Sequence, residues 1–136
     1  AGVYDPASGV WTLLEENAEG ADAITCAFGD AGRNLVPVAG DWSGSGRDSI
    51  GLYDPASGAW RLRMSVTNDG PELTFAFGGS GMMPVVGDWD GSGADSVGVY
   101  DPRTGRWLLR NANTAGEADV VVELRLPDGV PVVGRW

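Results

Sequence analysis

Apolar and polar residues alternate in short runs along this chain, and clusters of glycine, proline, aspartate and serine separate the runs. Trp60, Leu62 and Met64 alternate with Arg61 and Arg63, which is the period of a half-buried β-strand. No segment shows the 3.6-residue period of an amphipathic helix. The pattern therefore predicts an all-β chain of short strands.

The alternating runs recur as three tandem four-stranded repeats that fill the 136 residues. Tryptophans that close the repeats follow one another at a spacing of 47. The units are 1–50, 51–97 and 98–136, within a single repeat domain. Each unit is expected to contain four strands. The first strands are 2–4, 51–53 and 98–100, and the second strands start at Trp11, Trp60 and Trp107. The third strands are 24–28, 73–77 and 120–124, and the fourth are 37–42, 84–89 and 131–136. A repeat of this length is typical of stacked or radial folds whose units share a core.

Each first strand runs into the turn Asp-Pro-x-Ser/Thr-Gly, which Asp5, Asp54 and Asp101 begin. The aspartate side chain can bond the backbone ahead of it, proline presets φ, and glycine accepts a left-handed conformation. We expect a hairpin at each of these positions, with its aspartate serving the turn and not a reaction.

Two acidic loops recur after the last strand of the first two units, at 41–48 and 88–95. Their side-chain oxygens fall at positions 1, 3, 5 and 8, with glycines between them. Calcium prefers six to eight oxygen ligands, and alternate positions of a curled loop can point toward one centre. The candidate metal ligands are Asp41, Ser43, Ser45 and Asp48, and Asp88, Asp90, Ser92 and Asp95.

The alternative for both loops is a metal-free structure in which aspartate and serine side chains bond their own backbone. The third unit has Arg135 at the place of Asp41 and Asp88, which argues against a third metal site.

The motif Gly-Asp-Trp-Asp/Ser-Gly-Ser-Gly-x-Asp-Ser-Ile/Val-Gly-Leu/Val-Tyr, which starts at Gly40 and at Gly87, resembles the FG-GAP and VCBS-type repeats of integrin-like β-propellers. The resemblance implies four-stranded blades around an axis, calcium in the acidic loop, an extracellular location, and a role in adhesion or ligand recognition. Propellers have four to eight blades, so three would close badly and a homodimer would supply six. The alternative is a closed three-fold β-trefoil-type barrel, although the Gln-x-Trp signature of that family is missing.

The chain carries a net charge of −10, from 19 acidic residues against nine arginines. This charge disfavours nucleic acid and anionic membrane surfaces as partners, and no apolar run is long enough to cross a bilayer. The sole cysteine, Cys26, lies within an apolar alternation and is predicted to be a buried thiol.

Histidine and lysine are missing from the sequence, which excludes most pairs of a nucleophile with a general base. We therefore expect no catalytic residues and no enzymatic activity. A binding or structural role is favoured instead.

The two sets of tryptophans are expected to have different roles. Strand alternation points Trp11, Trp60 and Trp107 toward the core. Trp42, Trp89 and Trp136 end strands beside the acidic loops and are candidate ligand residues, which a multivalent carbohydrate-binding lectin would use to stack sugar rings. A third possibility is a structural, self-assembling repeat protein without a small ligand, whose exposed sheet edges drive dimerisation.

Overall fold

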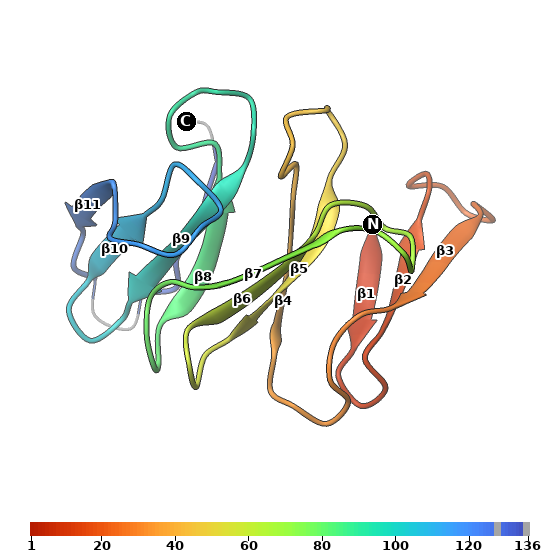
Figure 1. Cartoon of the computed structure of the whole chain (residues 1–136), viewed down its shortest axis with the longest axis horizontal. Coiled ribbons are helices and arrows are strands. Elements are labelled where there is room, and N and C mark those ends of the chain that lie inside the picture. Colours follow the sequence, from red (N-terminus) through yellow and green to blue (C-terminus); the bar gives the residue numbers. More distant parts are fainter. Residues whose placement is uncertain (127–128, 135–136) are drawn as a thin grey trace.

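The computed structural model describes residues 1–126 and 129–134. It contains three antiparallel sheets, so the all-β prediction is confirmed (Figure 1). The strands are β1 (Gly2–Asp5), β2 (Val10–Leu14), β3 (Ala23–Ala27), β4 (Val36–Gly40), β5 (Ser49–Asp54), β6 (Ala59–Arg63), β7 (Glu72–Ala76), β8 (Met83–Gly87), β9 (Ser96–Asp101), β10 (Arg106–Leu109) and β11 (Val120–Glu123). Within these residues we find no helix with the length and apolar character needed to span a membrane.

Each four-stranded sheet combines strands from two successive sequence units. The first sheet is β1-β2-β3, the second is β4-β5-β6-β7, and the third has the order β8-β9-β10-β11. Val38 of β4 lies opposite Gly51 of β5, and Val85 of β8 lies opposite Gly98 of β9. The last strand of one unit is thus the edge strand of the next sheet. None of the three sheets is closed into a barrel by the described residues.

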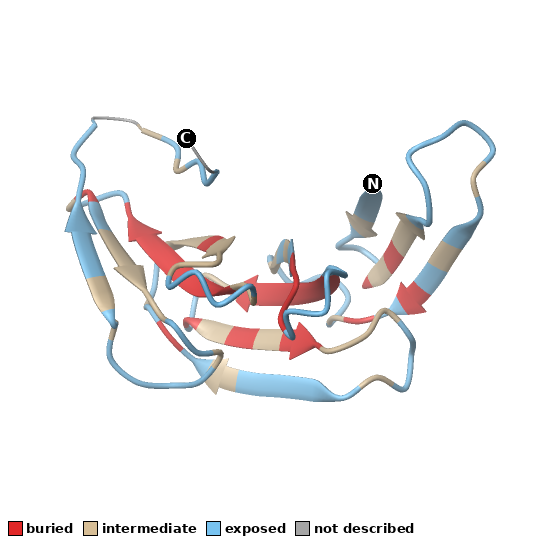
Figure 2. Ribbon diagram, turned by 90° about the horizontal axis from the view of Figure 1, so that it is seen from above, coloured by how far each residue is buried: buried red, intermediate tan, exposed pale blue. Residues whose placement is uncertain are grey.

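The three sheets follow one another along an arc, with β4 packed beside β8 at the inner side (Figure 2). One apolar core joins the first sheet to the second through Trp11, Cys26, Phe28, Ile50 and Leu52. A second core joins the second sheet to the third, through Trp42, Tyr53, Trp60, Leu62, Phe77, Val97 and Val99. β5 and β9 each have a hydrogen-bonded strand on both sides, and nearly all of their residues are buried.

A tyrosine and a tryptophan on neighbouring strands form the centre of each repeat. The ring centroids of Tyr53 and Trp60 lie 4.7 Å apart, and the Trp60 indole donates a hydrogen bond to the Phe77 carbonyl at 3.0 Å. Trp11 bonds the Phe28 carbonyl in the same way at 2.8 Å. The core positions expected for Trp11 and Trp60 are confirmed, whereas Trp107 is only half-buried. Cys26 is buried, as predicted.

The three aspartate-led turns form as predicted. Asp54 accepts hydrogen bonds from the Ala56 amide at 2.9 Å and from the Ser57 hydroxyl at 2.9 Å. These bonds lower the pKa of the Asp54 carboxyl, with a smaller contribution from Arg33. The closing glycine, Gly58, has φ = 77°, a left-handed conformation that favours this residue type.

The strand expected at 131–136 does not form over residues 131–134. Its last two positions, 135–136, lie outside the described residues. The segment has the same sequence pattern as β4 and β8, but it does not lie beside a strand such as β5 or β9 among the described residues. A strand requires a hydrogen-bonded neighbour, which local sequence alone does not supply.

Candidate functional site

The two acidic loops connect β4 to β5 and β8 to β9, and both lie on the same side of the molecule, at the top of Figure 1. Each begins where an inner strand leaves its sheet. The loops therefore form the part of the molecule in which the candidate metal and ligand residues gather.

In the first loop the backbone curls around the Asp41 carboxylate. Its Oδ1 accepts the amides of Ser45 at 3.0 Å and Ser43 at 3.3 Å, and its Oδ2 accepts the amide of Gly46 at 2.5 Å. Burial acts to raise the pKa of Asp41, but these hydrogen bonds outweigh it and the pKa is lowered. Asp41 is thus ionised and occupied by main-chain donors.

The second loop repeats this arrangement around Asp88. Its carboxylate accepts the amides of Ser92 and Gly93, each at 2.9 Å. Asp90 also accepts the Ser92 amide, at 3.0 Å. The Ser92 hydroxyl and the Ser92 amide lower the pKa of Asp90. The Asp90 side chain is exposed at the tip of the loop.

A pair of hydrogen bonds joins the two loops across the boundary between sheets. The Asp41 amide donates to Oδ2 of Asp95 at 2.9 Å, and the Asp95 amide donates to the Asp41 carbonyl at 2.8 Å. The two loops are therefore hydrogen-bonded to each other at their bases.

The arrangement does not fit a calcium ion. Within residues 1–126 and 129–134, no group of three or more His, Cys, Asp or Glu side chains is placed to hold a metal. The carboxylates of Asp41 and Asp88 already accept main-chain N–H groups, which compete with a cation for their oxygens. Asp48, the last candidate ligand of the first loop, is exposed. The geometry matches the metal-free alternative, and calcium binding stays a prediction.

The candidate ligand tryptophans are not open platforms. Trp42 is only 6% exposed, so its expected exposure is wrong. Its indole donates to the Ile50 carbonyl at 3.3 Å and its ring lies against Gly40, where a Cβ would come within 2.8 Å of the ring. Trp89 is half-buried and bonds the Val97 carbonyl at 3.3 Å. Trp136 lies outside the described residues.

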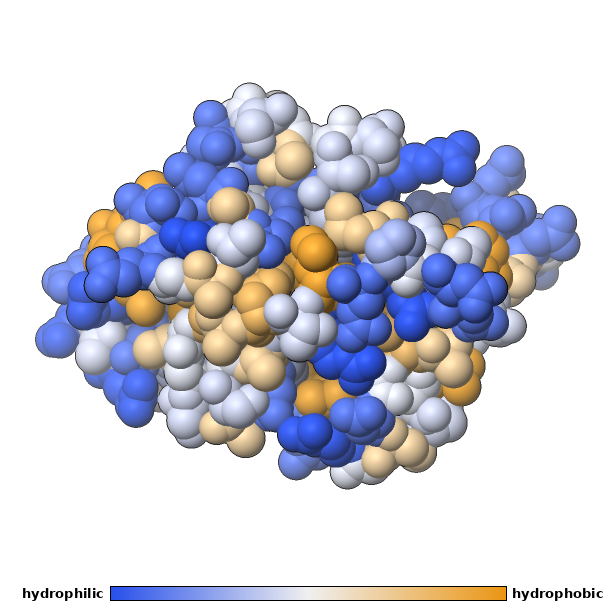
Figure 3. All heavy atoms as spheres, viewed as in Figure 1, coloured by the Kyte–Doolittle hydropathy of each residue, from blue (hydrophilic) through white to orange (hydrophobic). Residues whose placement is uncertain are grey.

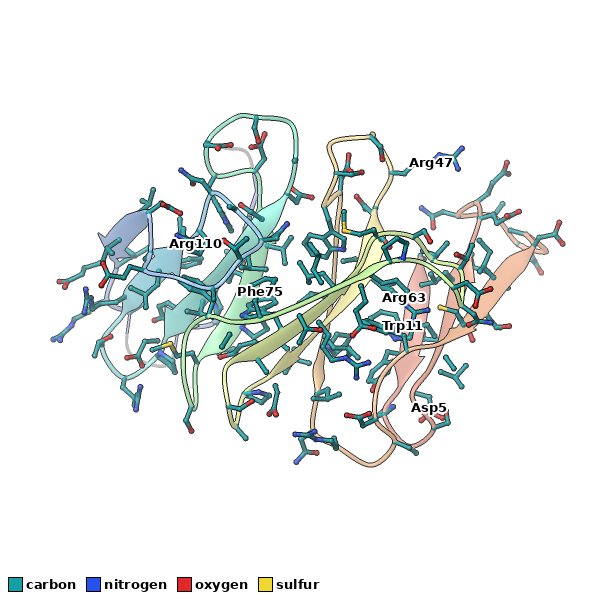
Figure 4. All side chains as sticks on the ribbon, in the orientation of Figure 1. Asp5, Trp11, Arg47, Arg63, Phe75 and Arg110 are labelled. Carbon is teal, nitrogen blue, oxygen red and sulfur yellow. The ribbon has the colours of Figure 1, made fainter. Side chains whose placement is uncertain are left out.

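The contact of Arg61 and Arg63 with the first sheet was not foreseen from the sequence. Their guanidinium carbons lie 5.2 and 4.7 Å from the centroid of the Phe28 ring. Arg63 (Figure 4) is buried and donates to the carbonyls of Thr67 and Asn68. Strand alternation marked both arginines only as the polar face of β6. The stacking of successive sheets, which makes that face an interface, is not visible in the alternation of one strand.

Comparison with family models, with curated proteins and with solved structures found no match for this chain. The resemblance to FG-GAP and VCBS-type repeats therefore rests on the sequence motifs alone and stays a prediction.

Proposed function

We propose that this chain is a non-enzymatic, extracellular, propeller-like repeat module for adhesion or ligand recognition, and that its acidic loops form the recognition surface. The observation that carries the proposal is the difference between the fixed and the exposed positions of the two loops. The aspartate at position 1, the two glycines and the serine at position 5 recur in both loops and determine their shape. The exposed tips differ.

Two tip positions show this difference. Ser43 in the first loop corresponds to Asp90 in the second, and Arg47 corresponds to Ala94. Ser43, Asp90 and Arg47 are exposed, and Figure 4 shows the Arg47 side chain pointing away from the body of the molecule. Variable tips on a rigid scaffold are the arrangement by which loops of β-proteins bind partners.

Two features of the chain argue for binding over catalysis. The sequence supplies neither histidine nor lysine for general base or Schiff-base chemistry. The carboxylates of Asp41, Asp54 and Asp88 are each held by main-chain amides, so they shape loops and turns.

The lectin alternative, in which sugar rings stack on exposed tryptophans, is weakened because Trp42 is buried. A carbohydrate ligand would have to contact the loop tips themselves, by hydrogen bonds to Asp90 and Arg47. The structural alternative, with assembly but no small ligand, predicts that substitutions at the tips have no effect on any binding measurement.

Arrays of purified oligosaccharides and of purified extracellular glycoproteins, probed with the labelled chain, test this function. We expect the parent chain to bind. The double variant Arg47→Ala/Asp90→Ala should lose this binding while its melting temperature stays that of the parent. A matched pair, Ala7→Ser with Thr104→Ser, alters the opposite ends of the sheets and should bind as the parent does. Absence of binding, or binding that the loop variant retains, would contradict the proposal.

A further inference from the structure

The first sheet presents an open edge at β1. In the second and third sheets the corresponding strands are β5 and β9, which pair on this side with β4 and β8. Among the described residues, none pairs with β1 on this side. One face of β1 is open as well: Val3 is 68% exposed, while its counterparts Leu52 and Val99, which pack against the preceding sheet, are 1% and 0% exposed. An open, apolar strand edge is a template for pairing with another strand.

A groove of about 960 Å³ lies along this edge, between the first and second sheets. Its walls include Ala1, Gly2 and Leu13 on one side, with Ala39 and Ile50 on the other. At the next boundary the corresponding position, beside β8, is occupied by β4. The groove thus has the position of an inner strand that the first sheet lacks.

Residues 130–134 have the sequence that fits this position. They read Val-Pro-Val-Val-Gly, against Met-Pro-Val-Val-Gly in β8 and Val-Pro-Val-Ala-Gly in β4. Val130 and Val132 are 73% and 69% exposed, whereas Val85, the counterpart of Val132 in β8, is 6% exposed. The segment therefore has the side chains of an inner strand, but these side chains are not packed in a sheet.

We propose that residues 130–134 of one copy of the chain pair antiparallel with β1 of a second copy. The register follows from the two examples within the chain, where Pro84 lies opposite Val99 and Pro37 lies opposite Leu52. It places Pro131 opposite Val3 and Val132 opposite Gly2. Reciprocal pairing gives both first sheets their fourth strand, and the dimer then contains six four-stranded sheets, a number at which sheets close into a ring.

The faces of the first and third sheets favour a second copy as the occupant. Trp60 of the second sheet packs on Val97 and Val99 of the third, whereas Trp107, its counterpart in the third sheet, is half-buried. In Figure 3, apolar spheres reach the surface over β11, where Val122 is 47% exposed. The third sheet of one copy therefore offers the first sheet of another the same kind of contact that joins the sheets within a chain.

The arrangement within one chain keeps the two surfaces apart. Figure 1 shows β1 at one end of the arc and β9, β10 and β11 at the other. A contact between unlike surfaces of two copies forms a closed ring when the rotation between them allows it. This pairing is independent of the recognition function, because it uses the strand edges and not the acidic loops.

The experiment is the solution mass of the 136-residue chain by light scattering and sedimentation. We expect twice the mass of 14.1 kDa, and stronger association at higher salt because each copy carries a net charge of −10. Val132→Asp places a charge in the groove, because its partner Gly2 lines it, and Val3→Asp places a charge on the opposite face of β1. Each substitution should return the mass to that of one chain. Both positions are exposed in the monomer, so neither substitution should unfold it.

Thr74→Asp, on the outer strand β7, is the matched control and should leave the dimer intact. A parent chain that is a monomer at all salt concentrations would overturn the proposal, as would an assembly larger than two copies. A dimer that survives both Val3→Asp and Val132→Asp would overturn it as well.

Discussion

Asp41 and Asp95 are hydrogen-bonded to each other in both directions, although the two residues belong to different loops. The amide of each residue donates a hydrogen bond to the other, to Oδ2 of Asp95 at 2.9 Å and to the carbonyl of Asp41 at 2.8 Å. Only the first of these bonds uses a side chain. It is therefore the one that a substitution can remove.

Asp95→Ala should destabilise the chain by about 1–3 kcal/mol, because a main-chain donor of the half-enclosed loop loses a charged acceptor. For a chain of this size the melting temperature should fall by about 3–10 °C. The control is Asp48→Ala, the corresponding exposed residue in the first loop, which should have little effect. Equal losses from both substitutions in circular-dichroism melts would show that the link between the loops is not what stabilises them.

Acid should weaken the turn around Asp54 specifically. Its folded pKa is lowered by the Ala56 amide and the Ser57 hydroxyl, below an unfolded value of about 3.9. The stabilisation is therefore fully present above pH 4 and is lost as pH falls through the folded pKa. Asp54→Asn does not titrate, so its melting temperature should approach that of the parent between pH 5 and 2. A difference that stays constant over that interval would count against this linkage.

Tryptophan substitutions should differ in cost between the sheets. Trp60→Phe removes a fully buried indole and its bond to the Phe77 carbonyl, and we expect a loss of about 1–3 kcal/mol in unfolding free energy. Trp107→Phe alters the half-buried counterpart and should cost less in the monomer. Urea denaturation at low protein concentration measures both. A larger loss at Trp107 would contradict the described order of the sheets.

Calcium should have little effect on stability, because main-chain amides occupy the carboxylates of Asp41 and Asp88. A ligand of the native state raises the melting temperature by mass action, so melts with millimolar calcium and with chelator should coincide. A rise with calcium that Asp88→Ala and Asp90→Ala abolish would establish the metal site that the sequence motif implies.

Local features of the fold were predictable from the sequence. The turn at Asp54 and the alternation of Trp60 and Leu62 depend on neighbouring residues, and both are present as expected. The membership of the sheets was not predictable, because a five-residue strand such as Val36–Gly40 carries no signal for which neighbour it will join. The structure pairs it with the strand that follows it, across the boundary of the sequence repeat.

The candidate site was predicted in its position but not in its chemistry. The spacing of Asp41, Ser43 and Ser45 fits either a cation or the loop's own amides, and only the direction of the N–H groups separates the two. The burial of Trp42 could not be predicted from the sequence either, because this tryptophan is buried by the contact between the second sheet and the third. Contacts between sheets are properties of the assembled fold, which local patterns do not encode.

The most direct test of the open edge is a disulfide across the proposed strand pair. In a Cys26→Ala background, Val3→Cys with Pro131→Cys places two thiols opposite each other, and Val3→Cys with Val133→Cys displaces them by two residues. Directly opposite residues on paired strands have Cβ atoms about 5 Å apart, whereas diagonal neighbours lie about 7–8 Å apart. On non-reducing gels the first variant should oxidise to a species of twice the 14.1 kDa chain mass, and the second should remain largely unlinked. A disulfide within one chain, or equal linking of both variants, would contradict the proposed pairing of two copies.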